Sequence, residues 1–193
     1  MDDIKGYAFI TSTGYDPEKG EPVKDPYLGD TPTLGACMTN IRRNVVEGDH
    51  IFVISGKIPN VPQYVIGGFE VAEKISAMEA YARFPNLRLS RDEKGRVVGN
   101  VICDKNGRQH PLDHHQNFEK RLQNYIVGTN PIVLTDALEI SRARRETPDI
   151  LGRVCAKTPQ LPLTKLLGRG GKKLDRSQID ELRSWLEGLK RGA

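Results

Sequence analysis

The chain has 193 residues, of which 37% are hydrophobic and 28% charged, and its formal net charge is +4 at pH 7. This composition is typical of a globular protein with one core and excludes a disordered or fibrous chain. No apolar run approaches the roughly 20 residues of a membrane helix, and the first residues lack the basic and then apolar pattern of a signal peptide. The sequence therefore predicts a cytoplasmic protein without a membrane partner.

Cysteine spacing and short motifs exclude several kinds of site. The three cysteines, at positions 37, 103 and 155, are scattered and have no CxxC spacing, so neither a disulfide framework nor a zinc site is expected. The residues Ser55-Gly56-Lys57 lack the rest of a P-loop, which excludes a nucleotide triphosphatase of that type. GxSxG, HExxH and GxGxxG motifs are also missing. We therefore expect reduced thiols and a site with no metal ion or cofactor.

The first quarter of the chain predicts a strand, a loop and a short helix. The β-prone residues at 7–10 open a strand, which the turn residues after them bring to an end. Four prolines within 17–33 exclude regular structure, so a long surface loop is expected there. The apolar spacing in 38–45 predicts a helix with Thr39 or Asn40 as its cap.

The middle of the chain predicts paired strands and a second helix. The apolar runs at 50–56 and 63–75 have strand length and are joined by a short loop that contains proline, so we expect them to pair. The pair Gly67-Gly68 inside the second run predicts a bulge or a tight bend. Residues 76–84 predict a helix with a capping box, made by its first serine and a glutamate three residues later.

The second half predicts further strands and an amphipathic helix. Residues 96–112 predict a strand followed by an Asn-Gly turn, and 124–134 predict two short strands separated by a Gly-Thr-Asn-Pro turn. One apolar face over 174–189 predicts a C-terminal helix, capped by Asp175 or Ser177, that packs on the rest of the protein.

These elements predict an α+β fold in which helices flank a curved mixed or antiparallel sheet, or a small β-barrel. Residues 1–167 are expected to form this domain. Residues 168–193 are expected to be a basic, glycine-rich linker and a C-terminal helix packed on the same domain. Much of the positive charge lies between Arg142 and Lys173, which indicates either a solvated surface or a surface for a polyanion.

The segment 34–57 gathers a cysteine, an asparagine and two arginines ahead of an apolar strand. On a short helix Asn40 and Arg43 share a face, while Arg42 points elsewhere. Guanidinium groups bind phosphate, carboxylate or guanine through paired donors, so an anion or base clamp is one interpretation and surface ion pairing is the other. Cys37 is a candidate nucleophile, although no histidine can be placed beside it from the sequence.

The ends of two predicted strands carry small polar groups. After the first strand, Thr11 and Ser12 offer hydroxyl donors and Tyr15 offers an aromatic ring. A tyrosine here can stack on a base, with packing in the core as the alternative. Ser55 and Gly56 end the apolar strand that follows the arginines.

The densest group of titratable residues lies in QHPLDHHQ and includes His110, Asp113 and His114. Such side chains bind metals or transfer protons near neutral pH, and a hydrogen-bonding or exposed loop is the alternative. Adjacent histidines of a strand point to opposite faces, so at most one of His114 and His115 joins the other two. These residues, with Cys37, are the candidates for a catalytic site.

Taken in order, TGYDP, LGACMTNIRRNVVEGDHIFVISGK and YVIGGFEVAEKISAMEAYARFP resemble the nucleotide-modification-associated domain 2 family of bacteria and phages. The most specific residues are Cys37, Ile41-Arg42-Arg43, Gly48-Asp49, Ser55-Gly56 and the helix around Tyr81. That family is found near genes for modified DNA bases, and the resemblance implies an action on or around modified nucleotides. The GDHIFVISGK hairpin is also similar to PUA-like, EVE-like and ASCH-like domains, small barrels that hold a base in a cleft.

The leading hypothesis is therefore a PUA-like domain that recognises a modified nucleotide or base, free or within DNA or RNA. In it Tyr15 stacks on the base and the arginines neutralise phosphate. The predicted ligand-binding set comprises Thr11, Ser12, Tyr15, Cys37, Asn40, Arg42, Arg43, Ser55, Gly56, Asn130 and Arg169. Two other hypotheses stay open: a metal-assisted hydrolase or transferase that uses the histidine group, and a protein-interaction module that docks through Trp185. The oligomeric state is not indicated.

Overall fold

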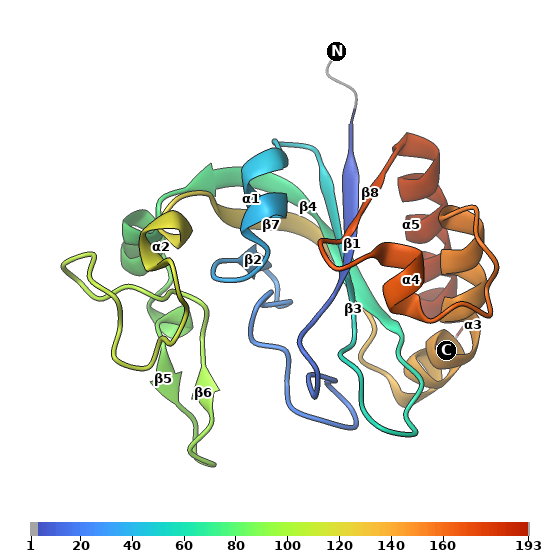
Figure 1. Cartoon of the computed structure of the whole chain (residues 1–193), viewed down its shortest axis with the longest axis horizontal. Helices are drawn as coiled ribbons and strands as arrows, with labels where there is room; N and C mark the ends of the chain where they lie inside the picture. Colours follow the sequence, from blue (N-terminus) through green and yellow to red (C-terminus); the bar gives the residue numbers. More distant parts are fainter. Residues whose placement is uncertain (1–3, 193) are drawn as a thin grey trace. The chain divides into compact units, whose positions relative to one another are not determined.

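The computed structural model describes residues 4–192 and has the predicted α+β fold with a mixed sheet (Figure 1). Within these residues the main sheet has the strand order β2-β7-β4-β3-β1-β8, and β5 and β6 form a separate pair. The strands are β1 (Gly6–Ile10), β2 (Thr33–Leu34), β3 (His50–Ile54), β4 (Val65–Ile75), β5 (Ser90–Arg91), β6 (Val97–Val98), β7 (Tyr125–Val133) and β8 (Lys172–Leu174). The helices are α1 (Thr39–Asn44), α2 (Ala77–Arg83), α3 (Ala137–Val154), α4 (Leu163–Leu167) and α5 (Arg176–Arg191), with 3-10 turns at Pro85–Leu87 and Phe118–Arg121.

Two compact units alternate along the chain. Unit 1 comprises the residues up to Val23, Gly48–Glu70 and the residues from Asn130 onward, and unit 2 comprises Lys24–Glu47 and Val71–Thr129. Strands β4 and β7 therefore each begin in one unit and end in the other. Residues 168–192 belong to unit 1, where β8 pairs with β1.

Strand β1 lies between β3 and β8 in unit 1. It pairs in parallel with β3, beginning with Gly6 opposite His50, and antiparallel with β8. All five residues of β3 are buried, which is typical of a strand that is covered on both faces. Strands β3 and β4 pair antiparallel, and their register shifts between Val53 and Ile54, beside Gly67. The predicted pairing and the predicted bulge are therefore confirmed.

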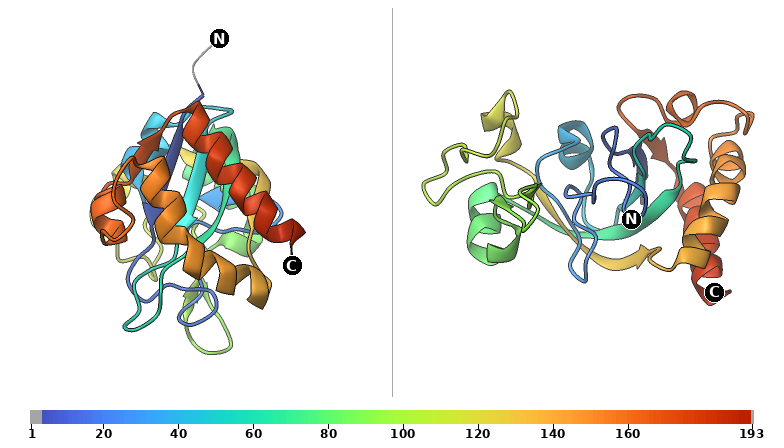
Figure 2. Two further views of the ribbon diagram at one scale, coloured as in Figure 1. Left: turned by 90° about the vertical axis from the view of Figure 1, so that its right-hand side faces the viewer. Right: turned by 90° about the horizontal axis from the view of Figure 1, so that it is seen from below.

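Helices α3 and α5 lie side by side in unit 1 (Figure 2). Helix α5 is the predicted C-terminal helix, and Asp175 is its N-cap. Its buried residues are Ile179, Leu182, Leu186 and Leu189. Trp185 donates a hydrogen bond from Nε1 to Glu146 Oε2 of α3 at 2.9 Å, so this indole is used within unit 1. Helix α3 was not predicted from the sequence.

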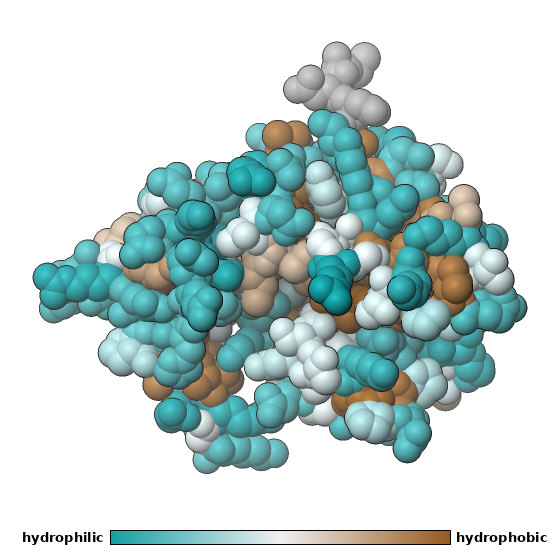
Figure 3. Space-filling model, viewed as in Figure 1, coloured by the Kyte–Doolittle hydropathy of each residue, from teal (hydrophilic) through white to brown (hydrophobic). Residues whose placement is uncertain are grey.

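Hydrophilic side chains cover most of the face shown in Figure 3. Among the described residues, the large hydrophobic side chains that are exposed come from different elements: Tyr27, Val46, Met78, Leu138 and Leu161. No helix in residues 4–192 is long and apolar enough to cross a membrane.

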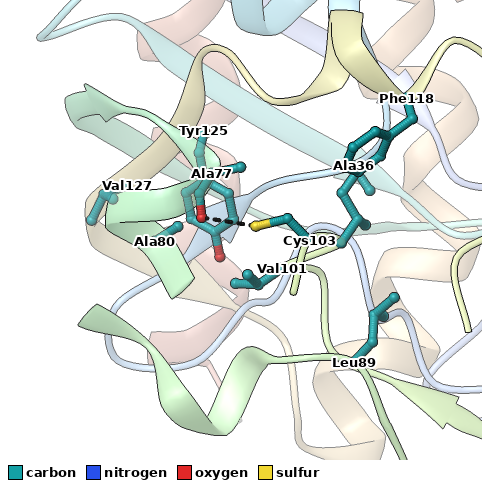
Figure 4. Packing of buried hydrophobic residues seen from close by; sticks show 10 residues of the cluster. Ala36, Ala77, Ala80, Leu89, Val101, Cys103, Phe118, Tyr125 and Val127 are labelled. Carbon is teal, nitrogen blue, oxygen red and sulfur yellow. Dashed lines mark hydrogen bonds between the residues drawn. The ribbon is translucent and has the colours of Figure 1, made fainter. Parts of the chain in front are cut away.

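Unit 2 has a hydrophobic core of its own, part of which Figure 4 shows. Helix α2 borders this core and has the predicted capping box: the Ser76 hydroxyl accepts the Glu79 N–H, and the Glu79 carboxylate accepts the Ser76 N–H. The Cys103 thiol donates to the Ala77 carbonyl at 3.4 Å, which satisfies the thiol inside the core. The other buried members of the core are Ala36, Ala80, Leu89, Val101, Ile102, Phe118, Tyr125 and Val127.

Two local predictions are wrong and one is confirmed. Strand β7 is one continuous strand rather than two, because it runs through the expected Gly-Thr-Asn-Pro turn. Helix α1 has no side-chain cap: Met38, with a φ of 50°, is its N-cap, and Thr39 is already helical. The predicted Asn-Gly turn is present, with a φ of 75° at Gly107 and a hydrogen bond of 3.1 Å from the Gly107 N–H to the Asp104 carbonyl.

Candidate functional site

The carboxyl ends of β1 and β3 meet at one edge of the sheet in unit 1, because these strands run parallel. The Thr11 N–H donates to the Ile54 carbonyl at 2.9 Å, and the Gly56 N–H donates to the Tyr15 carbonyl at 2.6 Å. Two segments that are distant in sequence are therefore joined just beyond both strands. We call this region, residues 11–15 and 55–56, the β1–β3 edge.

Gly56 is required at the β1–β3 edge because the chain there passes very close to Ser12. A Cβ atom on Gly56 would lie 2.0 Å from the Ser12 carbonyl oxygen, which is closer than any real side-chain contact. The Tyr15 N–H donates to the same carbonyl at 3.1 Å, and the Thr11 hydroxyl donates to the Tyr15 carbonyl at 3.2 Å. Residues 12–15 thus form a tight turn in which Ser12 is exposed and Tyr15 is half-buried.

The Ser55 hydroxyl stabilises the turn between β3 and β4. It is fully buried and accepts the Tyr64 N–H at 3.0 Å, while the Ser55 carbonyl accepts Nε2 of Gln63 at 2.6 Å. Ser55 is thus at the expected edge, but its hydroxyl is used inside the protein. The predicted role of Ser55, a contact between its hydroxyl and the polar edge of a ligand, therefore has no support from the position of that hydroxyl.

Arg169 lies in the loop between α4 and β8. Because β8 is antiparallel to β1, with Lys172 opposite Ala8, the residues before β8 extend toward the carboxyl end of β1. The Arg169 side chain is exposed, and two glycines of this loop have positive φ angles, 75° at Gly168 and 86° at Gly171. The topology therefore directs Arg169 toward the β1–β3 edge.

Asn130 lies at the other end of β3. Its Nδ2 donates to Glu70 Oε2 at 3.1 Å, and Glu70 is opposite His50, the first residue of β3. His50, Asn130 and Arg183 lie around one small recess at that end. The structure therefore separates Asn130 from the β1–β3 edge.

In unit 2, a buried carboxylate holds the segment that leads into α1. Asp25 accepts hydrogen bonds from the backbone N–H groups of residues 35–37 and from Nδ2 of Asn100 at 3.0 Å. The Tyr125 hydroxyl donates to Asn100 Oδ1 at 2.7 Å. Sequence reasoning missed this network, because an aspartate before a proline is an ordinary turn signal and no local pattern links it to residues 35–37.

Cys37 lies beside the Asp25 carboxylate, and its thiol is poorly suited to act as a nucleophile. Burial raises the pKa of the Cys37 thiol to about 12, and the Asp25 charge acts in the same direction. The charges of Arg121 and Arg42 lower the pKa but offset these two effects only in part. Since the thiolate is the reactive form, a thiol that stays protonated near neutral pH gives little support to the predicted catalytic role.

The two adjacent arginines of α1 have different surroundings, in line with their predicted separation on the helix. Arg42 is fully buried: its Nε donates to the Cys37 carbonyl at 3.0 Å, and its Nη1 donates to three carbonyls within residues 121–124. Its guanidinium thus ties α1 to the chain before β7, in place of the predicted phosphate contact. Asn40 and Arg43 are exposed on α1 and stay predicted ligand contacts.

The histidine group of unit 2 pairs differently from the expected trio. Asp113 Oδ1 lies 2.5 Å from Nδ1 of His115, and Asp113 Oδ2 accepts Nε2 of Gln109 at 2.8 Å. His114 is exposed, and Nδ1 of His110 accepts the Leu112 N–H at 3.1 Å. Among residues 4–192, no group of three or more His, Cys, Asp or Glu side chains is placed to hold a metal ion.

Unit 1 therefore brings together part of the predicted ligand-binding set at the β1–β3 edge, with Arg169 directed toward it. The residues that share unit 2 are Cys37, Asn40, Arg42 and Arg43. No protein-family model, no curated protein and no solved structure matches the chain. The resemblance to the nucleotide-modification-associated domain 2 family thus stays a prediction from sequence.

Proposed function

We propose that the chain recognises a nucleotide or base, with modified bases as its biological ligands, and that the β1–β3 edge provides the contact surface. The observation that carries this proposal is the parallel pairing of β1 and β3, together with the backbone bond between Gly56 and Tyr15. In open α/β sheets, ligands commonly bind outside the carboxyl ends of parallel strands. Here β1 and β3 form one such parallel pair within a mixed sheet.

Three side chains of unit 1 supply the chemistry that a nucleotide requires. Tyr15 stacks on the heterocycle, the exposed Ser12 hydroxyl hydrogen-bonds a polar group of the base, and Arg169 pairs with a phosphate. A base inside a duplex stack cannot reach such an edge. The ligand is therefore a free nucleotide or one that is single-stranded or flipped out.

The experiment is a thermal-shift screen of canonical and modified nucleoside monophosphates, together with mass spectrometry of small molecules that co-purify with the protein. Binding to the folded state raises the melting temperature by mass action. The variant Tyr15→Ala is expected to weaken binding by about 5-fold to 150-fold, because stacking on one base is worth about 1–3 kcal/mol. The matched variant Tyr15→Phe keeps the ring and should bind nearly as well as the wild type. Equal affinity of all three proteins would contradict the proposal.

The same samples separate recognition from catalysis. Binding that persists with a chelator, and that leaves the nucleotide chemically unchanged, is the expected result for a recognition domain. Conversion of the nucleotide that is lost in a His115→Ala variant would instead favour the enzyme hypothesis, because His115 is the histidine that pairs with Asp113.

A further inference from the structure

Residues 150–174 contain six cationic side chains and no acidic one. This stretch runs from the end of α3 through α4 to β8. Its cationic side chains are Arg153, Lys157, Lys165, Arg169, Lys172 and Lys173. The formal charge of this stretch is thus +6, against +4 for the whole chain, and a basic stretch of this kind favours anionic partners.

Most of these cations have no ion pair, whereas all but one of the cations on α3 and α5 have one; the exception is Arg145, which donates to Ser141. On α3 and α5, Arg142, Arg144, Arg153, Arg176, Arg183, Lys190 and Arg191 each pair with a carboxylate. Among the described residues, none of the cations in 157–173 forms an ion pair. Clustered like charges without partners repel one another and lower the stability of the folded state, so this arrangement favours an anionic ligand over a purely structural role.

Four of the unpaired cations lie close together around α4. The Lys157 ammonium donates to the carbonyls of Lys165 at 2.9 Å and of Leu166 at 3.2 Å, which places it at the end of α4. Lys172 lies in β8, opposite Ala8 of β1. Helix α4 in turn lies against β1 (Figure 1). We call Lys157, Lys165, Arg169 and Lys172 the α4 cationic surface.

Lys173 is not part of the α4 cationic surface. It follows Lys172 in β8 and pairs in register with Tyr7, and successive side chains of a strand point to opposite faces. The surface is therefore made of three lysines, which act as point charges, and of Arg169, which the proposed function already assigns to one phosphate.

We propose that the ligand of the β1–β3 edge is part of a single-stranded polynucleotide, whose phosphate backbone continues across the α4 cationic surface. This inference rests on the proposed function and further specifies the ligand as part of a polymer. One nucleotide needs only Arg169 for its phosphate, and the three lysines supply contacts for neighbouring phosphates. A polynucleotide fits because its backbone carries one negative charge per nucleotide at a short spacing and has no positive group that the lysines would repel.

The test compares a labelled single-stranded DNA of about 20 nucleotides, and the same sequence as RNA, with a nucleoside monophosphate. Fluorescence anisotropy gives the affinity for the oligonucleotide between about 50 and 200 mM salt. With four phosphate contacts, the slope of log K against log salt is expected to be about −2.8, since each contact on a single strand contributes about −0.7. The double variant Lys165→Gln, Lys172→Gln should reduce the slope to about −1.4, because it removes two of these contacts.

The control is the double variant Arg153→Gln, Arg176→Gln, which removes the same charge from two arginines that are ion-paired with Glu181 and Asp180. It should keep the wild-type slope, and equal losses in both double variants would overturn the proposal. So would binding of heparin as tight as that of the oligonucleotide, because the surface would then accept any polyanion.

The outcomes also distinguish this inference from the proposed function. If monophosphates raise the melting temperature but the oligonucleotide binds no more tightly than a monophosphate, the polymer inference fails and nucleotide recognition stands. If neither ligand binds, both fail. In the expected result, the Lys165→Gln, Lys172→Gln variant keeps its thermal shift with a monophosphate and loses affinity only for the polymer.

Discussion

Arg144 holds Asp16 through two hydrogen bonds of 3.0 Å, one from each terminal nitrogen of its guanidinium, although the two residues are 128 positions apart in the chain. The same guanidinium donates to Glu18 at 2.8 Å and to the Pro62 carbonyl, and it lies over the Tyr64 ring at 4.6 Å. Helix α3 therefore holds the loop directly after Tyr15, which is the aromatic residue of the β1–β3 edge.

We expect Arg144→Ala to lower the free energy of unfolding by about 3 kcal/mol, because it leaves the buried Asp16 carboxylate without its cation. Burial alone would raise the pKa of Asp16, yet the hydrogen bonds from Arg144 and from two backbone N–H groups lower it. Arg144→Lys should restore only part of the loss, since an ammonium cannot make the paired contact. Urea unfolding measures these changes. The exposed neighbour Arg145 provides the control, and a loss in Arg145→Ala as large as that in Arg144→Ala would refute this reading.

The adjacent arginines of α1 give a second matched pair. Arg42→Ala removes the donor for four backbone carbonyls in the interior of unit 2. Because an unpaired buried polar group costs about 1–3 kcal/mol, the free energy of unfolding should fall by at least about 2 kcal/mol. Arg43→Ala should change the same quantity by less than about 0.5 kcal/mol, because the side chain is exposed. Chemical denaturation of both variants measures their free energies of unfolding. Similar values would show that Arg42 does not stabilise the fold.

Local signals were enough to predict several elements. The capping box of α2 depends on Ser76 and Glu79 alone. Helix α5 is indicated by its N-cap, Asp175, and by the apolar face of the helix. The apolar run of β3 indicates a buried strand without reference to its neighbours. These elements were predicted correctly because their cause lies within a few residues of the chain.

Other features depend on contacts between distant segments and could not be predicted from local patterns. Helix α3 contains Pro148, whose missing N–H is unfavourable inside a helix, and the sequence predicts only a basic surface for these residues. Spacing separates Arg42 from Arg43 on a helix but does not say which of them is buried. The β1–β3 edge was expected only as a set of polar strand ends, and it is the parallel pairing that joins Gly56 to Tyr15.

Two glycines offer a test of how tightly the β1–β3 edge is packed. Gly56→Ala would place a Cβ atom 2.0 Å from the Ser12 carbonyl, so the edge must deform and the unfolding free energy should fall by at least about 1 kcal/mol. Gly188→Ala in α5 has no atom within 4 Å of the added Cβ, and it should stabilise the protein by about 0.5–1 kcal/mol because alanine is the better helix former. Thermal unfolding distinguishes the two. The two substitutions should change the free energy of unfolding in opposite directions. No change in Gly56→Ala would show that the β1–β3 edge is loosely packed.

His50 at the start of β3 predicts a dependence of stability on pH. Its Nε2 lies 2.8 Å from Nη1 of Arg183, so the ring accepts this bond and is neutral. Burial and then the Arg183 charge lower the pKa of His50, and the Glu70 charge opposes them. Below about pH 6.5, the ordinary pKa of histidine, the unfolded chain therefore binds a proton that the folded chain does not.

The free energy of unfolding contributed by His50 should consequently fall as the pH decreases below about 6.5, by at most about 1.4 kcal/mol per pH unit, and should level off below the folded pKa. Comparison with His50→Gln isolates this contribution, because glutamine keeps an acceptor for Arg183 and does not titrate. Urea unfolding of both proteins between about pH 5 and pH 8 measures it. The wild type should lose stability relative to His50→Gln on the acid side. Parallel curves for the wild type and His50→Gln would mean that His50 is free to take up a proton in the folded state.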